Sequence, residues 1–297
     1  MNTTLHGVAG RSGTAIAAAV LVLLLGAFAP QSRAEGIALD HWPTERADDM
    51  VALQRGARIF VNYCLNCHSA RQMRWNRLRE IGIDDAQIKS QLIFGDQKVG
   101  DVMTVAMNPH DAKNWFGKAP PDLSVMVRAR STEEHRGTDY IYTLLRGFYR
   151  DSSTLTGWNN VVYPNIAMPN ILWQRQGARK LQLSRTEWEE HPAEEGKSAK
   201  RELVRVTSTY ETDGSVSVER TVLDKGETGV TAVFTPVDPK AAAAVDDEVA
   251  DLVAYLNWMA EPTAHARYKI GVWVMGFLAI FLLVAHWLNK VFWRDIK

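Results

Sequence analysis

Apolar residues recur at helical spacing in two stretches that lie far apart in the chain. In the first, from about Asp48 to Asn62, the repeating positions are Leu53, Ala57, Phe60 and Val61. In the second, from about Asp246 to Ala260, they are Val249, Leu252, Val253, Leu256 and Met259. Spacings of three and four residues place these side chains on one face of a helix. The pattern therefore predicts two amphipathic helices, each with acidic residues at its positive start.

Gly56 lies inside the first of these helices and lowers its intrinsic stability. A glycine in such a position suggests the close approach of another backbone, and the helix from about Asp246 to Ala260 is the expected partner. The alternative is a tolerated surface glycine.

Turn and cap residues predict two shorter helices. Pro120-Pro121-Asp122 opens a helix that we expect to run to about Ala129. Thr138 is the expected cap of a helix that runs to Arg146 and ends at Gly147. Tyr140, Leu144 and Leu145 would face inward.

Residues 174–235 differ in character from the rest of the chain. Gln174 to Arg201 is polar and rich in charge, which favours a loop with a helical turn. Leu203 to Val222 alternates with period two on either side of Asp213-Gly214, a typical hairpin turn. We predict a β-hairpin inserted into an otherwise helical domain, as a contact or covering element rather than a chemical site.

Two long apolar stretches stand near the ends of the chain. Ile16 to Ala29 follows Arg11 and precedes Ser32-Arg33-Ala34, which predicts a signal peptide over residues 1–34; an uncleaved anchor is the alternative. Ile270 to Leu288 is apolar apart from His286 and has the length of a membrane helix. We expect an anchor over 266–289, a cytoplasmic tail over 290–297, and residues 35–265 on the outer side.

The formal net charge of zero hides an uneven distribution. Residues 35–265 hold 27 Lys and Arg against 33 Asp and Glu, whereas both ends are basic. An acidic exported domain repels nucleic acid, so no nucleic-acid partner is expected, and it favours a basic protein partner. Ordinary solubility charge explains the excess equally well.

The strongest chemical signal is Cys64-Leu65-Asn66-Cys67-His68, the C-x-x-C-H pattern of covalent haem attachment. Two thiols at this spacing can each bond one vinyl group of a porphyrin, and the adjacent imidazole can bind the iron from one face. Cys64 and Cys67 are the only cysteines of the chain. The pattern predicts one covalent c-type haem with His68 as the proximal ligand.

Two other readings of the cysteine pair are weaker. A thioredoxin-like dithiol needs a βαβ context and gives no role to His68. A zinc site needs further ligands, which no second cysteine pair or paired histidines supply.

A methionine thioether is the usual second axial ligand of a c-type electron carrier. Met168 lies in Tyr163-Pro164-Asn165-Ile166-Ala167-Met168-Pro169-Asn170, where two prolines favour a rigid extended loop. From spacing alone, a role for Met168 in core packing is an open alternative. Met103 and Met107 remain alternatives, and His110 or His135 are weaker ones.

Several stretches together resemble the cytochrome c1 family, the haem subunits of quinol–cytochrome c reductase, in a bacterial form. The resemblance covers Glu35 to Lys297. It rests on Tyr63–Leu78, Val99–Met107, Ala119–Arg130 with its A-P-P-D-L-S segment, Asp139–Gly147, Gly157–Asn170 and the final anchor. We therefore expect a mainly α fold, a class I cytochrome c-like domain with an inserted β-hairpin and one C-terminal transmembrane helix.

The resemblance implies roles for five residues. Met168 matches the family's axial methionine, and Arg130 matches an arginine that binds a haem propionate. Tyr140 matches an aromatic residue near the haem, and Pro121 a proline that lines the proximal side. Asn114 lies where the family has polar haem contacts, although Trp115-Phe116-Gly117 departs from some members.

The resemblance also implies an electron-transfer subunit without bond chemistry of its own. Its partners would be cytochrome b, a Rieske iron–sulfur protein, a soluble or membrane-bound cytochrome c acceptor and membrane lipid, in a dimeric complex. The chain would cross the bacterial inner membrane once, with its haem domain in the periplasm. A membrane-anchored monohaem cytochrome c that serves another oxidase or dehydrogenase is the alternative.

Overall fold

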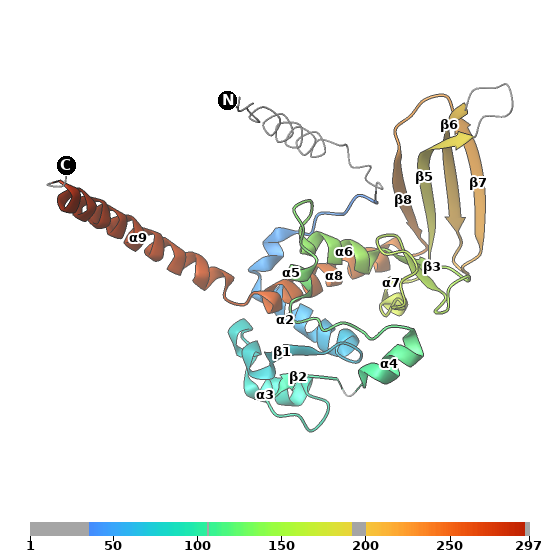
Figure 1. The fold of residues 1–297 in the computed structure, drawn as a ribbon. Coiled ribbons are helices and arrows are strands. Elements are labelled where there is room, and N and C mark those ends of the chain that lie inside the picture. Colours follow the sequence, from blue (N-terminus) through green and yellow to red (C-terminus); the bar gives the residue numbers. More distant parts are fainter. Residues whose placement is uncertain (1–35, 106, 192–199, 295–297) are drawn as a thin grey trace, which may run out of the picture. The chain divides into compact units, whose positions relative to one another are not determined.

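The computed structural model describes residues 36–105, 107–191 and 200–294. The predicted signal peptide and the last residues of the predicted tail lie outside this part of the chain. Helices account for more of the described residues than strands (Figure 1). The expectation of a helical domain with a β insertion therefore holds, while the class I topology stays a prediction.

The core is built on the two helices that the apolar pattern predicts. Helix α2 (Met50–Ile59) is capped by Asp49, whose side chain accepts a hydrogen bond from the Val51 amide, and it continues as the π-helical turn η2 (Phe60–Cys64). Helix α8 (Pro239–Ala260) packs along α2. Asp251 on α8 is buried and receives hydrogen bonds from Arg46 and Arg55 at 2.5 Å each. These two arginines balance a carboxylate that would otherwise be costly to bury.

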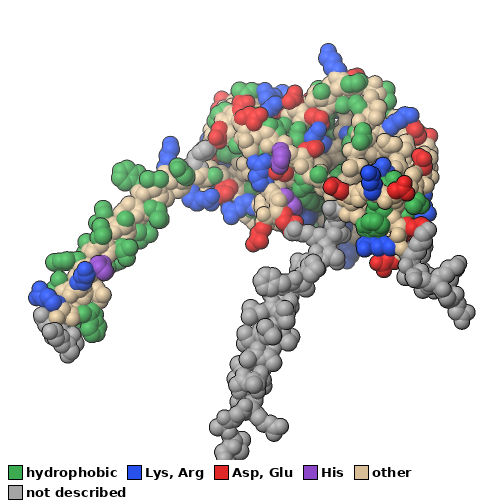
Figure 2. Space-filling model, turned by 90° about the horizontal axis from the view of Figure 1, so that it is seen from above, with side chains coloured by type: hydrophobic (Ala, Val, Ile, Leu, Met, Phe, Trp, Pro, Cys, Tyr) green, Lys and Arg blue, Asp and Glu red, His purple; other side chains and the backbone are tan. Residues whose placement is uncertain are grey.

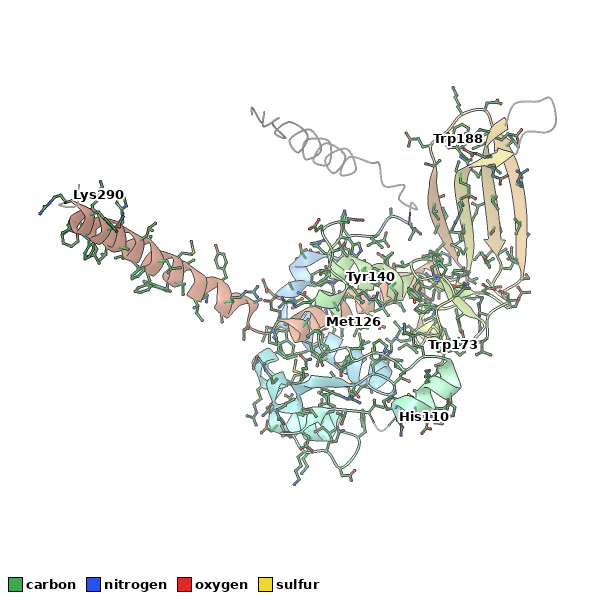
Figure 3. The ribbon with its side chains drawn as sticks, viewed as in Figure 1. His110, Met126, Tyr140, Trp173, Trp188 and Lys290 are labelled. Atoms are coloured by element: carbon green, nitrogen blue, oxygen red, sulfur yellow. The ribbon has the colours of Figure 1, made fainter. Side chains whose placement is uncertain are left out.

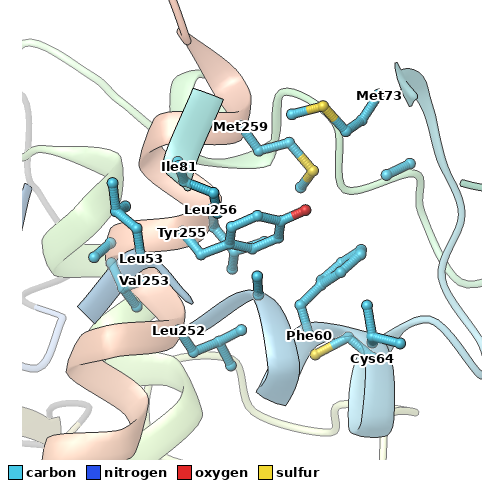
Figure 4. Packing of buried hydrophobic residues seen from close by; sticks show 14 of the residues in the cluster. Leu53, Phe60, Cys64, Met73, Ile81, Leu252, Val253, Tyr255, Leu256 and Met259 are labelled. Carbon is cyan, nitrogen blue, oxygen red and sulfur yellow. The ribbon is translucent and has the colours of Figure 1, made fainter. Parts of the chain in front are cut away.

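Buried side chains of α2, η2 and α8 interlock around Tyr255 (Figure 4). The ring of Tyr255 lies 5.4 Å from that of Phe60, and its hydroxyl contacts Met103 Sδ at 3.7 Å. Apolar contacts of this kind supply most of the folding free energy. The same cluster includes Cys64, so the core reaches the cysteine motif.

Helix α8 begins earlier than predicted. Asp238 caps it by accepting from the amides of Lys240 and Ala241, and Pro239 occupies the first helical position. A proline there lacks only a hydrogen bond that the first turn could not form. The predicted start at Asp246 was therefore wrong by about two turns.

The short helices also differ from prediction at their starts. Helix α5 (Met126–Ala129) begins after Asp122, because that side chain instead caps a turn by accepting from Ser124. Helix α6 (Gly137–Arg146) begins before Thr138, with Arg136 as its N-cap residue and no side-chain cap. Its predicted end at Gly147 is correct. Two small antiparallel sheets, one of β1 and β2 and one of β3 and β4, complete the domain together with several short helices. The bounds of these elements are η1 (Thr44–Ala47), β1 (Ala70–Arg74), η3 (Trp75–Ile81), α3 (Asp85–Gln87), η4 (Ile88–Leu92), β2 (Val102–Met103), α4 (Pro109–Phe116), β3 (Phe148–Arg150), β4 (Trp158–Asn160) and α7 (Trp173–Gln176).

The insertion is a four-stranded antiparallel sheet rather than a hairpin (Figure 1). Its strand order is β7 (Val216–Leu223), β6 (Lys200–Tyr210), β5 (Arg179–His191) and β8 (Gly229–Pro236). The predicted hairpin is the β6–β7 pair, joined through Asp213 and Gly214. The predicted loop over 174–201 was wrong for Arg179–His191, because this strand pairs with both β6 and β8.

Helix α9 (Ala264–Trp293) includes 28 residues, Ala266–Trp293, that are long and apolar enough to cross a membrane. None of its apolar window is buried against the other described residues. Figure 2 shows hydrophobic side chains along this helix with Lys and Arg gathered near its ends. Helix α9 is thus a candidate membrane anchor.

Candidate haem-attachment site

The cysteine motif begins where α2 widens into a π-helical turn. The Leu65 amide donates to the Phe60 carbonyl at 2.9 Å, five residues back, and this wider turn ends at Cys64. The amides of Cys67 and His68 then both donate to the Cys64 carbonyl, at 3.1 and 2.9 Å. The turn therefore folds both cysteines and the histidine into one compact unit. π-Helical turns of this kind often mark functional sites.

Pro121 fixes the protonation of His68. The His68 Nδ1 atom lies 2.7 Å from the Pro121 carbonyl oxygen. Because a carbonyl can only accept, Nδ1 carries the proton, and the lone pair is on Nε2. Burial lowers the pKa of His68, and the Pro121 hydrogen bond and the charge of Asp122 offset only part of that. The imidazole is thus neutral at pH 7 and oriented, as a metal ligand must be.

The strand after the motif holds the Pro121 segment in place. The Leu123 amide donates to the Ser69 carbonyl at 2.9 Å, and the Arg71 amide donates to Asp122 at 2.9 Å. Burial would raise the pKa of Asp122, but hydrogen bonds from Ser124 and Arg71 outweigh it and hold that pKa low. An ionised Asp122 therefore ties both segments together, and with them the pair of His68 and Pro121.

The donor set fits a covalent haem better than a redox-active dithiol. Burial raises the pKa of the Cys64 thiol to about 12, and the neighbouring Cys67 adds to the rise. Catalytic dithiols need a lowered thiol pKa, so Cys64 is unsuited to thiol exchange. Two thiols beside a neutral imidazole with a free Nε2 match the chemistry of a c-type haem. Among the described residues, no cluster of three or more His, Cys, Asp or Glu offers an alternative metal site.

Buried asparagines hold the loop that carries Met168. Asn160 is fully buried, and its side-chain Nδ2 donates to the Leu144 carbonyl at 2.8 Å. Its Oδ1 accepts from the backbone amides of Val162 and Tyr163. Asn159 accepts from the amide of Asn165, which adopts a φ of 58°. Asparagine tolerates this left-handed conformation better than most residues.

Met168 itself is half-buried and packs against the core cluster. The alternative ligand Met103 is fully buried, and its sulfur contacts the Tyr255 hydroxyl. Packing therefore explains Met103, while Met168 lies on a loop whose conformation is fixed by polar contacts. The two prolines predicted a rigid loop here, whereas the role of the asparagines was not predicted, although Asn159-Asn160 is a turn signal.

Arg130 and Tyr140 come together at the corner between α5 and α6. The Arg130 guanidinium carbon lies 5.3 Å from the centre of the Tyr140 ring, and the His135 ring stacks on that ring at 5.7 Å (Figure 3 labels Tyr140). A β-carbon on Gly137 would lie 1.7 Å from the Val127 carbonyl oxygen, so the corner is tightly closed. Stacking on Tyr140 accounts for the His135 ring, which sequence alone left as a weak alternative ligand.

Asn114 is placed apart from these contacts. It lies exposed on α4, and its amide nitrogen is 3.4 Å from Nδ1 of His110. Within the described residues, no hydrogen bond joins Asn114 to the cysteine motif. The contacts thus bring Pro121 to His68, and Arg130 to Tyr140, while Asn114 stands outside both groups.

A dithiol and an oriented imidazole in a helical domain with a candidate anchor are the features of a membrane-bound c-type cytochrome. Comparison with known proteins narrows this class. A model of the cytochrome C1 family matches residues 43–180 and 236–296. The chain therefore belongs to the cytochrome c1 family, whose members carry a covalently bound c-type haem.

Individual relatives extend over nearly the whole chain. Ammonia monooxygenase gamma subunit from Nitrosomonas europaea is 38% identical over 277 residues, which is 93% of this chain and 97% of that protein. Cytochrome c1 of Allochromatium vinosum is 34% identical over 249 residues, 84% of this chain and 86% of the relative. Cytochrome c1 of Rhodospirillum rubrum is 27% identical over 306 residues, which covers 95% of this chain and 97% of the relative. The family model leaves out residues 181–235, most of the inserted sheet.

Proposed function

We propose that this chain is the electron-transfer subunit of a bacterial quinol–cytochrome c reductase. It would take electrons from a Rieske iron–sulfur protein and pass them to a soluble or membrane-bound c-type cytochrome. The observation that carries the proposal is the oriented imidazole: His68 Nδ1 lies 2.7 Å from the Pro121 carbonyl, beside two thiols, in a chain of this family.

Each residue of the site has a role in this proposal. Cys64 and Cys67 would form the thioether bonds, and His68, through Nε2, and Met168 would bind the iron. Arg130 would bind a propionate carboxylate, with its guanidinium carbon 5.3 Å from the centre of the Tyr140 ring. When bound, the haem supplies one iron centre that accepts and releases a single electron. The protein sets its potential through the axial pair, burial and hydrogen bonding.

The names of relatives support cytochrome b as a partner. A Candida albicans relative is named cytochrome b-c1 complex catalytic subunit, and a Bradyrhizobium diazoefficiens relative is named cytochrome b/c1. We propose a dimeric complex in the bacterial inner membrane, anchored by α9, with the haem domain on the periplasmic side after removal of residues 1–34. Intact-mass measurement of the mature chain tests that removal.

Replacing the second axial ligand tests the site. Met168→Leu should keep the covalent haem but lower the midpoint potential sharply, because the thioether favours the reduced iron. Met103→Leu is the matched control, since it swaps a buried core methionine for a residue of similar volume. An unchanged midpoint in Met168→Leu would remove that residue from the site.

Purification in mild detergent tests the partners. Co-purification with cytochrome b and a Rieske protein is the expected result. The name of the Nitrosomonas europaea relative favours one specific alternative, a membrane-anchored cytochrome that serves an oxygenase. Recovery of the chain with such an enzyme, and without cytochrome b, would support that alternative instead.

A further inference from the structure

Arg175 connects three elements of the domain at one point. It lies on α7, and its Nε donates to Oε2 of Glu248 on α8 at 2.7 Å, while Nη2 donates to Oε1 of the same carboxylate. Its Nη1 donates to the hydroxyl of Tyr63 at 3.3 Å, and its guanidinium carbon lies 5.9 Å from the centre of the Tyr63 ring. Hydrogen bonds to Glu248, then to Tyr63, raise the pKa of Arg175, so it stays charged. We call Arg175, Glu248 and Tyr63 the Arg175 clamp.

The clamp lies next to both segments that would bind the iron. Tyr63 directly precedes Cys64 in the π-helical turn, and four residues separate Met168 from the start of α7. The loop and α7 form one unit, because buried Asn170 donates to the buried Gln176 side chain at 2.9 Å and accepts from the Leu172 amide. A displacement of α7 would therefore also displace the backbone close to Met168.

Glu248 provides a fixed point for this connection. It lies on α8, which packs along α2, and α2 runs directly into the turn that holds Tyr63 and Cys64. A bidentate arginine–carboxylate pair restricts both distance and orientation, which a lysine could not do. The clamp thus ties α7 both to α8 and to the π-helical turn that ends at Cys64.

We propose that Arg175 is a positioning residue that holds the Met168 loop against the haem-attachment turn. The proposal rests on the proposed role of Met168 as an axial ligand. The pair is partly exposed, with side-chain exposures of 46% for Arg175 and 27% for Glu248. Its effect on a local opening equilibrium is therefore about two- to fivefold. Global unfolding, which breaks the whole core, should change little.

Competition by imidazole measures this local opening. Imidazole binds the ferric haem where Met168 leaves, so its apparent affinity rises with the fraction of open loop. We expect Arg175→Met in the detergent-solubilised holoprotein to bind imidazole about two- to fivefold more tightly, as followed by the visible spectrum. Arg77→Met is the matched control, because Arg77 forms an exposed bidentate pair with Glu80 at 2.8 Å and should leave the affinity unchanged.

Two further variants separate pairing from side-chain loss. Glu248→Gln should raise the affinity for imidazole, as Arg175→Met does. It provides the test if Arg175→Met fails to accumulate with haem. The exchange Arg175→Glu with Glu248→Arg rebuilds the ion pair and should restore much of the wild-type affinity. If the exchanged protein binds imidazole as tightly as Arg175→Met does, the proposal is overturned.

Met168→Leu distinguishes failure of this proposal from failure of the proposed site. It should raise the imidazole affinity well beyond any clamp variant. If it does so while Arg175→Met matches Arg77→Met, the clamp has no positioning role and the proposed site stands. If Met168→Leu leaves the affinity unchanged, Met168 is not the displaced ligand, and both proposals fall.

Discussion

Gly56 on α2 faces Asp251 on α8 so closely that no side chain fits between them. A β-carbon at Gly56 would lie 2.1 Å from the Asp251 carbonyl oxygen and 2.8 Å from the Tyr255 β-carbon. The same turn of α8 carries the buried Asp251 carboxylate, which binds Arg46 and Arg55. The contact between the two helices is therefore set by a missing side chain on one of them and fixed by an ion cluster beside it.

Substitution of this glycine should separate the two helices. Gly56→Ala should destabilise the holoprotein by about 3 kcal/mol, because overpacking a backbone contact outweighs the better helix propensity of alanine. Thermal unfolding followed by circular dichroism measures this. Gly95→Ala is the control, since a β-carbon at Gly95 meets nothing within 4 Å. Equal unfolding temperatures for the two variants would contradict the packing argument.

Asn160 should be essential to the Met168 loop. Asn160→Ala removes a fully buried amide that bonds Leu144, Val162 and Tyr163, and it leaves those backbone groups unsatisfied. The expected cost is about 2–3 kcal/mol. The unfolding temperature and the visible spectrum of the ferric holoprotein measure this loss. Gln182→Ala, at an exposed position of β5, should change neither quantity. If Asn160→Ala behaves like Gln182→Ala, Asn160 does not stabilise the Met168 loop.

Asp139 should make stability depend on pH. Burial would raise the pKa of this carboxyl, but the Trp42 amide and the Arg136 guanidinium outweigh burial and hold the pKa below its ordinary value. A depressed folded-state pKa contributes stability above the unfolded value of about 3.9, and this is lost as the pH falls through the folded value. Asp139→Asn should therefore be less stable than wild type at pH 7, with a gap that narrows below about pH 4.

Thermal unfolding of both proteins at pH 7 and near pH 3 measures that gap. Asp224→Asn is a suitable control, because Asp224 is exposed. A gap of the same size at both pH values would show that Asp139 acts only through its shape.

Arg179 should hold the inserted sheet on the domain. Its guanidinium donates to the carbonyls of Arg146 and Phe148 and lies 3.9 Å from the centre of the Phe234 ring. Burial lowers its pKa to about 10, yet it remains charged at pH 7. Arg179→Met should expose residues 181–235 to faster limited proteolysis while the haem spectrum stays unchanged. Arg185→Met, at an exposed position of the same strand, should be cleaved at the wild-type rate. If Arg179→Met is also cleaved at that rate, Arg179 does not anchor the sheet.

Parts of the site could be predicted from local sequence, and others could not. C-x-x-C-H fixes its own chemistry because all three groups lie within one turn. The contact of His68 with Pro121 spans 53 residues, so only the resemblance to a family pointed to it. The Met168 loop depends on Asn159 and Asn160, whose side-chain oxygens accept from backbone amides of the loop. The asparagine pair signals a turn, but the sequence does not show which amides it binds.

The errors in the predicted fold have similar causes. Strand β5 was predicted as a loop because its charged residues mask the alternation of Leu181 and Leu183, and pairing with β6 and β8 decides its structure. Helix α8 starts at Pro239 because Asp238 caps it, a signal that the acidic run further on obscured.

The sequence alone determined the cysteine motif, the two amphipathic core helices and the apolar span of α9, because each depends on residues within a few turns of one another. The glycine at position 56 suggested a close approach between those helices, and the folded chain confirmed it. The tertiary structure decided the tautomer of His68, the scaffold of Met168, the four-stranded insertion and the Arg175 clamp. Each of these joins groups that are distant in the chain, and only the folded chain decides which donor meets which acceptor.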